Sequence, residues 1–353
     1  MTTLDDFLGG ESPQAGAPPP SPPPEEAPVP EPTGVSQVLT PAGIEVYYQE
    51  APKRLYRVRQ PDIKIRTEGG ELESIYREWR EVPSVTTVID VLDRSGALTY
   101  WGMKVGAQGV AALARKGLVV TGQADPFGGR PLMIPNGAGG LTEITMDNIA
   151  PLLGEHKLTV NDVKESGGRR GQNAHDALET WIEKGILPQI EVFPEEEQGY
   201  VTGLRSFLEA IDGKVEDLES EVMVGSVEHG FAGRYDMRFR LAAPALVCRR
   251  AYPKKKDVYG ELEPGRYLPD LKTSKYVMSK QFLQLAAYEG ASIEDGYEPS
   301  DFHAVIHVMP DGRYEVRLST DKQFVDPRRG EIGLEDFLAV KQAYHVTTRK
   351  GWR

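Results

Sequence analysis

Two stretches, FAGRYDMRFRL at residues 231–241 and YLPDLK at residues 267–272, decide the fold that the sequence predicts. Apolar and polar side chains alternate in the first stretch and in residues 219–226 just before it, which is typical of strands. The turn at residues 228–230, Glu-His-Gly, joins those two runs. The second stretch predicts a third strand, so three strands follow one another in this part of the chain.

Alternation in the third strand puts Asp270 and Lys272 on one face and Leu271 on the other. If the second and third strands pair, Asp236 can sit opposite Asp270. Two carboxylates at that separation repel each other unless a cation joins them, and oxygen ligands suit Mg²⁺ or Mn²⁺. The ammonium of Lys272 can hold a water beside the metal and offset charge on a phosphate.

Helices flank these strands. They are predicted at residues 170–184, 196–211, 279–290 and 334–345, and a hairpin at residues 302–309 and 314–318 turns at Pro310-Asp311-Gly312. The order helix, three strands, helix, two strands predicts an α/β domain over residues 166–353, with a sheet flanked by helices.

The N-terminal part divides into two regions. Residues 1–45 hold 11 of the 27 prolines, and the first 52 residues hold eight acids and no Lys or Arg. Such a Pro- and acid-rich head is expected to be disordered, as a spacer or tether, and its segment TLDDFL at residues 3–8 could dock on a protein partner. Residues 46–165 are expected to form strands and then helices, with a Gly/Pro-rich loop at residues 121–141.

Composition excludes several classes of protein. Removing the eight acids of the head from the net charge of −12 leaves −4, so the body is only mildly acidic and DNA binding stays open. The single cysteine, Cys248, excludes a disulfide framework and a four-Cys iron–sulfur cluster within the chain. We find no long apolar run and no secretory signal, so we expect a cytoplasmic protein without membrane contact.

Other chemistries lack their motifs. The sequence contains no GxxxxGK[ST], no GxGxxG and no HExxH. His303 and His307 lie four residues apart on a predicted strand, about 13 Å at 3.3 Å per residue, so they cannot share a metal. We expect both histidines at a sheet surface.

Further polar residues follow the acids in order. His175 ends Gly171-Gln-Asn-Ala-His on the helix before the sheet, and Gln284 and Tyr288 share a face of the helix after the third strand. The series is GxxxH, GxxD, DxK and QxxxY. This series resembles the RecB-like branch of the PD-(D/E)XK nucleases, which includes phage, CRISPR-associated and mitochondrial exonucleases. The resemblance covers about residues 80–320, and PSVTTVI at residues 83–89 is similar to the helical entry of the phage and mitochondrial members.

The resemblance implies a restriction-endonuclease-like core with a mixed central sheet, and a metal-dependent DNA exonuclease that works in recombination, repair or replication. Its implied roles fall on individual residues. Metal ligands would be His175, Asp236, Asp270 and the backbone carbonyl of Leu271; Asp236, Asp270 and Lys272 would be catalytic; and Gln284 and Tyr288 would support the site and contact DNA. Glu179 and Glu221 are possible acids behind these ligands.

Basic residues suggest a DNA path near the site. They are Arg169-Arg170, Arg249-Arg250, Lys254 to Lys256, Lys275 and Lys280, and Tyr252, Tyr259 and Tyr276 lie among them. The missing cysteines make the chain similar to members without an iron–sulfur cluster. An inactive nuclease-like DNA-binding or recombination-partner protein is the main alternative, and an adaptor that works through the head is another. The sequence does not determine the polarity of digestion or the preference for single or double strands. It also leaves open whether the enzyme is an exonuclease or an endonuclease, and its oligomeric state.

Overall fold

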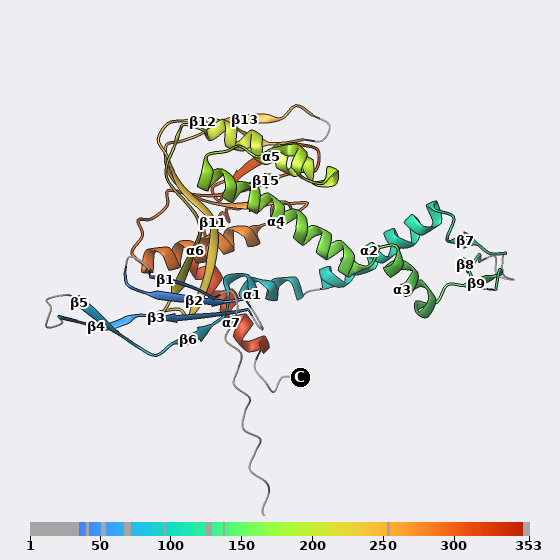
Figure 1. Ribbon diagram of the computed structural model, residues 1–353, viewed down its shortest axis with the longest axis horizontal. Helices are drawn as coiled ribbons and strands as arrows, with labels where there is room; N and C mark the ends of the chain where they lie inside the picture. The colour runs from blue at the N-terminus through green and yellow to red at the C-terminus, as the bar shows by residue number, and fades with distance from the viewer. Residues whose placement is uncertain are drawn as a thin grey trace, which may run out of the picture.

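A computed structural model describes the chain at residues 35–39, 42–50, 54–66, 72–94, 96–123, 129–136, 138–252 and 255–348. It is a mixed α/β protein with a five-stranded central sheet (Figure 1). The strands are β10 (Val215–Ser226), β11 (Phe231–Leu241), β14 (Gly265–Lys272), β15 (Phe302–Val308) and β16 (Tyr314–Leu318), in that spatial order. Only β14 and β15 are parallel, and the helix between them makes the crossover.

Helices cover both faces of this sheet. The helices α4 (Val160–Lys184) and α5 (Glu195–Ile211) contribute Leu178, Trp181, Leu204 and Phe207 to a core against one face. On the other face, α6 (Ser279–Glu294), α7 (Leu334–Thr348) and α1 (Val85–Ile89) pack Phe282, Phe337 and Val88 into a second core. The predicted fold class is therefore confirmed at the level of a mixed sheet flanked by helices.

One helix is longer than its pattern indicates. The predicted start at residue 170 is wrong, because α4 begins at Val160 after a capping box in which Thr159 and Asp162 bond each other's backbone N–H groups. The predicted domain boundary at residue 166 therefore falls inside a continuous helix. The helix ends at Lys184, and Gly185 caps it with a φ of +66°, which suits glycine.

Sheet strands also occur where loops were expected. The long connection before β14 forms a hairpin of β12 (Ala245–Arg250) and β13 (Val258–Leu262). The loop predicted at residues 121–141 contains the strand β8 (Leu132–Pro135), which pairs with β7 (Val120–Thr121) and β9 (Leu141–Glu143) at its two ends to form a small sheet. A short turn of 3₁₀ helix, η3 (Ile190–Val192), precedes α5.

A separate N-terminal sheet lies beside the domain. Its strands are β1 (Val35–Leu39), β2 (Glu45–Gln49), β3 (Leu55–Arg59) and β6 (Arg80–Val82), and β4 (Pro61–Arg66) and β5 (Leu72–Tyr76) form an adjoining hairpin. The predicted head of residues 1–45 is thus too long, since β1 already pairs with β2. Residues 1–34 lie outside the described residues. Val46 and Val58 pack on Met223 and Ala232, which joins this sheet to the β10–β11 hairpin.

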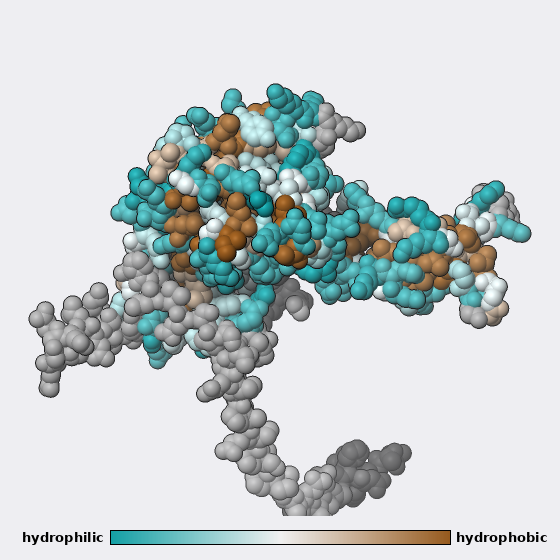
Figure 2. Space-filling model, turned by 45° about the horizontal axis from the view of Figure 1, so that its top comes forward, coloured by the Kyte–Doolittle hydropathy of each residue, from teal (hydrophilic) through white to brown (hydrophobic). Residues whose placement is uncertain are grey.

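An arm extends away from the domain (Figure 1). It comprises η2 (Asp90–Arg94), α2 (Gly96–Arg115), the β7–β9 sheet, α3 (Met146–Glu155) and the start of α4. Leu113, Val119, Ile134 and Ile149 form its own small core. Figure 2 shows hydrophobic surface on the arm, where Leu132, Leu141 and Met146 are exposed. Among the described helices, none is both long and apolar enough to cross a membrane.

Candidate metal centre

The two aspartates of the predicted pair come together where β11 and β14 separate. The strands pair as far as Phe239 opposite Tyr267, and the same register carried three residues further puts Asp236 opposite Asp270. Beyond that point the ladder opens, and Asp236 Oδ2 accepts a hydrogen bond of 2.8 Å from the backbone N–H of Leu271. The side chain of Asp236 therefore replaces a backbone partner and is held between the two strands.

Three side chains from three elements meet at this opening. One ligand atom each of His175 on α4, Glu221 on β10 and Asp236 on β11 lie within 4.8 Å of one another. His175 Nδ1 is 3.5 Å from Asp236 Oδ1. An imidazole and two carboxylates at these separations are a donor set that fits a divalent cation. Glu221, predicted to stand behind the ligands, is thus a member of the cluster.

Glu221 occupies this place at a cost. Its φ of +52° lies in the left-handed region, which a residue with a Cβ adopts at a cost of about 1–2 kcal/mol. Arg234 on the neighbouring strand holds the carboxylate through a 2.7 Å ion pair. Burial, with the nearby carboxylate of Asp236, raises the pKa of Glu221. Strained backbone of this kind is concentrated at functional sites.

Asp270 forms the inner wall of the centre. Its side chain is only 1% exposed, and Oδ1 accepts hydrogen bonds from Lys272 Nζ at 2.6 Å and Gln284 Nε2 at 3.3 Å. Burial is the main cause that raises the pKa of Asp270 to about 6. Oδ2 lies beside the same ammonium but accepts no well-directed hydrogen bond from the described residues. Asp270 is not a member of the cluster of His175, Glu221 and Asp236, and its Oδ2 lies 2.6 Å from the Lys272 ammonium.

Lys272 stays cationic in this setting. Burial opposes its charge, but the carboxylates of Asp270 and Asp236 outweigh burial and raise the pKa of Lys272. The side chain is 24% exposed and makes one directed bond, to Asp270. An ammonium has three donors, so two remain for a water or a phosphate oxygen.

Tyr288 closes the centre from α6. It accepts a hydrogen bond of 3.1 Å from Gln284, so its own hydroxyl proton remains for another acceptor. Burial and the two aspartates raise the pKa of Tyr288 well above its ordinary value, which keeps that proton in place. Its ring lies against Gly233, where an added Cβ would be 2.5 Å from Cε1. The glycine of GxxD is therefore required for the approach of Tyr288.

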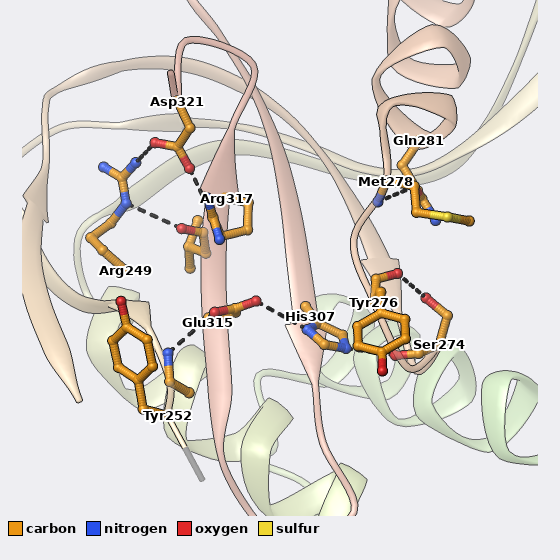
Figure 3. A network of polar contacts seen from close by, with 12 residues as sticks. Arg249, Tyr252, Ser274, Tyr276, Met278, Gln281, His307, Glu315, Arg317 and Asp321 are labelled. Carbon is orange, nitrogen blue, oxygen red and sulfur yellow. Dashed lines mark hydrogen bonds and ion pairs between the residues drawn. The ribbon is translucent and has the colours of Figure 1, made fainter. Parts of the chain in front are cut away.

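Other predicted residues have different places. Glu179 lies one turn beyond His175 and adds to the negative field at Glu221, and Leu271 contributes its N–H to Asp236. Lys275 lines a cavity that His175 and Lys272 also line. His307 is not at a sheet surface as predicted; it is 4% exposed and bridges Glu315 and the carbonyl of Ser274 (Figure 3).

Two parts of the predicted DNA path have partners within the protein. Arg249 forms a 2.7 Å ion pair with Asp321 and bonds the carbonyl of Val316 (Figure 3). Arg169 forms a 2.9 Å ion pair with the buried Glu197. The pairing of Arg234 with Glu221 was not predicted. The residues on either side of Arg234 in the sequence are the same as would flank an arginine that points into solvent from a strand.

No protein-family model matches the chain, and a comparison with curated proteins finds no match either.

Proposed function

We propose that the protein is a metal-dependent DNA exonuclease of the RecB-like PD-(D/E)XK type. The observation that carries the proposal is the convergence of His175, Glu221 and Asp236 beside the buried pair of Asp270 and Lys272. Structural ion pairs on strands do not require three acids at one strand opening. Carboxylates beside a lysine and an imidazole are suited to phosphodiester hydrolysis, in which charge builds up on phosphate oxygens.

The metal would be Mg²⁺ or Mn²⁺, held by His175, Glu221 and Asp236, with Asp270 available as a further ligand. When bound, such an ion activates water and stabilises the leaving oxygen. Asp236 is held by the Leu271 N–H and Glu221 by Arg234, so both carboxylates are oriented before any ligand arrives.

Lys272 and Tyr288 supply the donors. The ammonium of Lys272 is held by Asp270 and can orient an attacking water or stabilise a phosphate oxygen with its other protons. Tyr288 can donate its hydroxyl proton to a second phosphate oxygen, since Gln284 supports its oxygen from behind. Lys275 and Lys280 would contact the DNA backbone nearby. The biological setting would be recombination, repair or replication of phage or host DNA.

The test is a time course on end-labelled linear and covalently closed circular DNA with Mg²⁺, Mn²⁺ or EDTA. We expect metal-dependent loss of linear DNA while circles are spared. Asp270→Ala and Lys272→Ala should abolish cleavage, and Glu216→Gln, which loses an exposed ion pair on the same sheet, should not. Nicked circles would indicate an endonuclease. DNA binding without cleavage would favour an inactive DNA-binding protein, and variants as active as wild type would refute the site.

A further inference from the structure

Two cavities flank the candidate metal centre and share walls with it. One has a volume of about 750 Å³ and is lined by His175 and Lys272. The other has a volume of about 730 Å³ and is lined by Gly233 and Tyr288. Both border α4, through Gly171 on one side and its neighbour Gln172 on the other. A DNA strand that places a phosphate at the centre would therefore extend into both cavities.

The first cavity, named the basic cavity, suits phosphate. Its charged lining comprises Arg170, Lys272, Lys275, Arg313, Asp311 and two histidines. Arg313 is paired with Asp311, but Arg170 and Lys275 form no ion pair with any described residue. Arg170 Nε is buried and has no hydrogen-bond partner in the described part of the chain. Arg170 also bonds Ser166 and lies over the ring of Tyr200, and Lys275 lies over the ring of Tyr276, so the charge of neither cation is offset by a carboxylate in an ion pair.

The face of α4 that lines this cavity includes two glycines, which carry no side chain. Gly171 lies one turn before His175 and Gly167 two turns before it, and all three residues line the cavity. Glycine within a helix costs about 1 kcal/mol relative to alanine. Packing does not require it here, because an added Cβ would meet only Arg170 at 3.7 Å or Thr273 at 3.8 Å. The glycines allow a sugar–phosphate chain to lie against the helix.

The loop that carries Lys275 is held in place (Figure 3). His307 Nε2 lies 2.6 Å from the carbonyl of Ser274, and His307 Nδ1 lies 3.3 Å from Glu315. Glu315 in turn accepts a hydrogen bond from the backbone N–H of Ala251. The backbone just before Lys275 is therefore anchored to the central sheet, which positions the ammonium beside the cavity.

The second cavity, named the tyrosine cavity, has a different chemistry. Its lining includes the tyrosines Tyr48, Tyr56, Tyr288 and Tyr344 and the hydroxyl residues Ser84, Thr86, Thr87 and Thr348. Its arginines are already paired, Arg54 with Glu50 at 2.8 Å and Arg234 with Glu221 at 2.7 Å. The acids Glu81 and Asp90 line the cavity as well. Aromatic rings and hydroxyls beside acids suit a nucleobase and sugar better than a chain of phosphates.

We propose that the cut strand crosses the centre in one orientation, with its phosphate chain in the basic cavity and its unpaired terminal nucleoside in the tyrosine cavity. This proposal rests on the nuclease function proposed above and names its substrate as a single-stranded DNA end. The N-terminal sheet, α1 and α7 form the far wall of the tyrosine cavity. A base that enters it must leave its partner strand, so a paired end has to fray before cleavage.

The tyrosine cavity is tested with Tyr48→Ser on a single-stranded oligonucleotide whose terminal nucleotide is either normal or abasic. Stacking of one base is worth about 1–3 kcal/mol, so wild type should release the normal nucleotide about 5- to 150-fold faster. Tyr48→Ser should reduce that preference sharply. Tyr47→Ser is the matched control, because Tyr47 is the adjacent residue of β2, does not line the cavity and packs on Trp79 instead.

The basic cavity is tested with Arg170→Gln on oligonucleotides that carry neutral methylphosphonates at internal positions. Neutral linkages near the cut should slow cleavage by the wild type. Arg170→Gln should cleave slowly whether the linkages are neutral or normal phosphates. For Arg170→Gln, the slope of log DNA affinity against log salt concentration should also decrease, by the amount that corresponds to about one lost phosphate contact. Arg205→Gln is the control, because Arg205 is a helix arginine paired with Glu209 outside the cavity.

The outcomes separate the two proposals. If wild type cleaves DNA but releases normal and abasic ends equally, the orientation is refuted and the nuclease function stands. If wild type cleaves no DNA with any metal, both are refuted. Tyr344→Ser, on α7, replaces Tyr48→Ser if that variant does not fold, and it should cause the same loss of preference.

Discussion

The exchange Glu221→Gln should separate a metal ligand from a structural acid. Without a cation, the carboxylates of Glu221 and Asp236 lie within one 4.8 Å cluster and repel each other. Glutamine removes one charge and keeps an oxygen for Arg234. We therefore expect Glu221→Gln to be at least as stable as wild type in EDTA.

With Mg²⁺ the order should reverse. A ligand at 100 times its Kd stabilises the native state by about 2.7 kcal/mol. An unfolding entropy of about 2.1 cal/mol/K per residue over about 300 residues converts this into a rise of ~4 °C in Tm. If the lost carboxylate weakens binding 100-fold, the remaining gain is about 0.4 kcal/mol, which is less than 1 °C.

Thermal unfolding in EDTA and in Mg²⁺, without DNA, measures both effects. Glu216→Gln is the control, because Glu216 pairs with Arg240 at the same 2.7 Å across the same two strands but is exposed. Exposed pairs contribute little, so its Tm and its Mg²⁺ response should match those of wild type. If Glu221→Gln is destabilised in EDTA and responds fully to Mg²⁺, Glu221 is only a partner of Arg234 and its place in the metal site is refuted.

Three further predictions concern other residues. Lys272→Gln should lower the cleavage rate by about 10²- to 10⁴-fold but keep the Mg²⁺ shift in Tm, and loss of that shift would contradict a donor role. Gly233→Ala should cost about 1–3 kcal/mol by displacing Tyr288 and should slow cleavage, whereas Gly168→Ala, with no atom near its added Cβ, should be neutral or stabilising by chemical denaturation. Burial raises the pKa of Asp295 to about 8, so the folded state keeps a proton that the unfolded state loses near pH 4, and stability should fall between those values. Asp295→Asn should therefore raise Tm at pH 8 and not at pH 4, and an unchanged pH profile would contradict this.

The sequence predicted the paired aspartates because strand alternation determines which face each residue occupies. The register of β11 and β14 follows from that alternation, and it brings Asp236 to Asp270. The start of α4 was missed because Gly167 and Gly168 resemble a helix end, although the capping box at Thr159 was readable. In this helix tertiary packing overrides a local propensity of about 1 kcal/mol per glycine.

Glu221 was predicted to lie behind the ligands, but its place in the cluster itself could not be predicted, because that place depends on its backbone. The expected strand began near this residue, whereas β10 begins six residues earlier at Val215. Nothing in the sequence marks a glutamate for left-handed φ, which is usually adopted by Gly, Asn or Asp. The same holds for His307, whose burial follows from partners on three other segments that no local pattern connects.

The unfavourable features of the centre would have a common explanation in the cation proposed above. Glu221 is strained, Asp270 is buried with a raised pKa, and Asp236 adds a third carboxylate. Arg234 and Lys272 each compensate one acid, which leaves excess negative charge at the strand opening. A protein selected for stability alone would replace these residues, since a buried ion pair is often no better than an apolar contact. Their combination at one place is expected where binding of a divalent ion offsets the cost and the resulting charge serves catalysis.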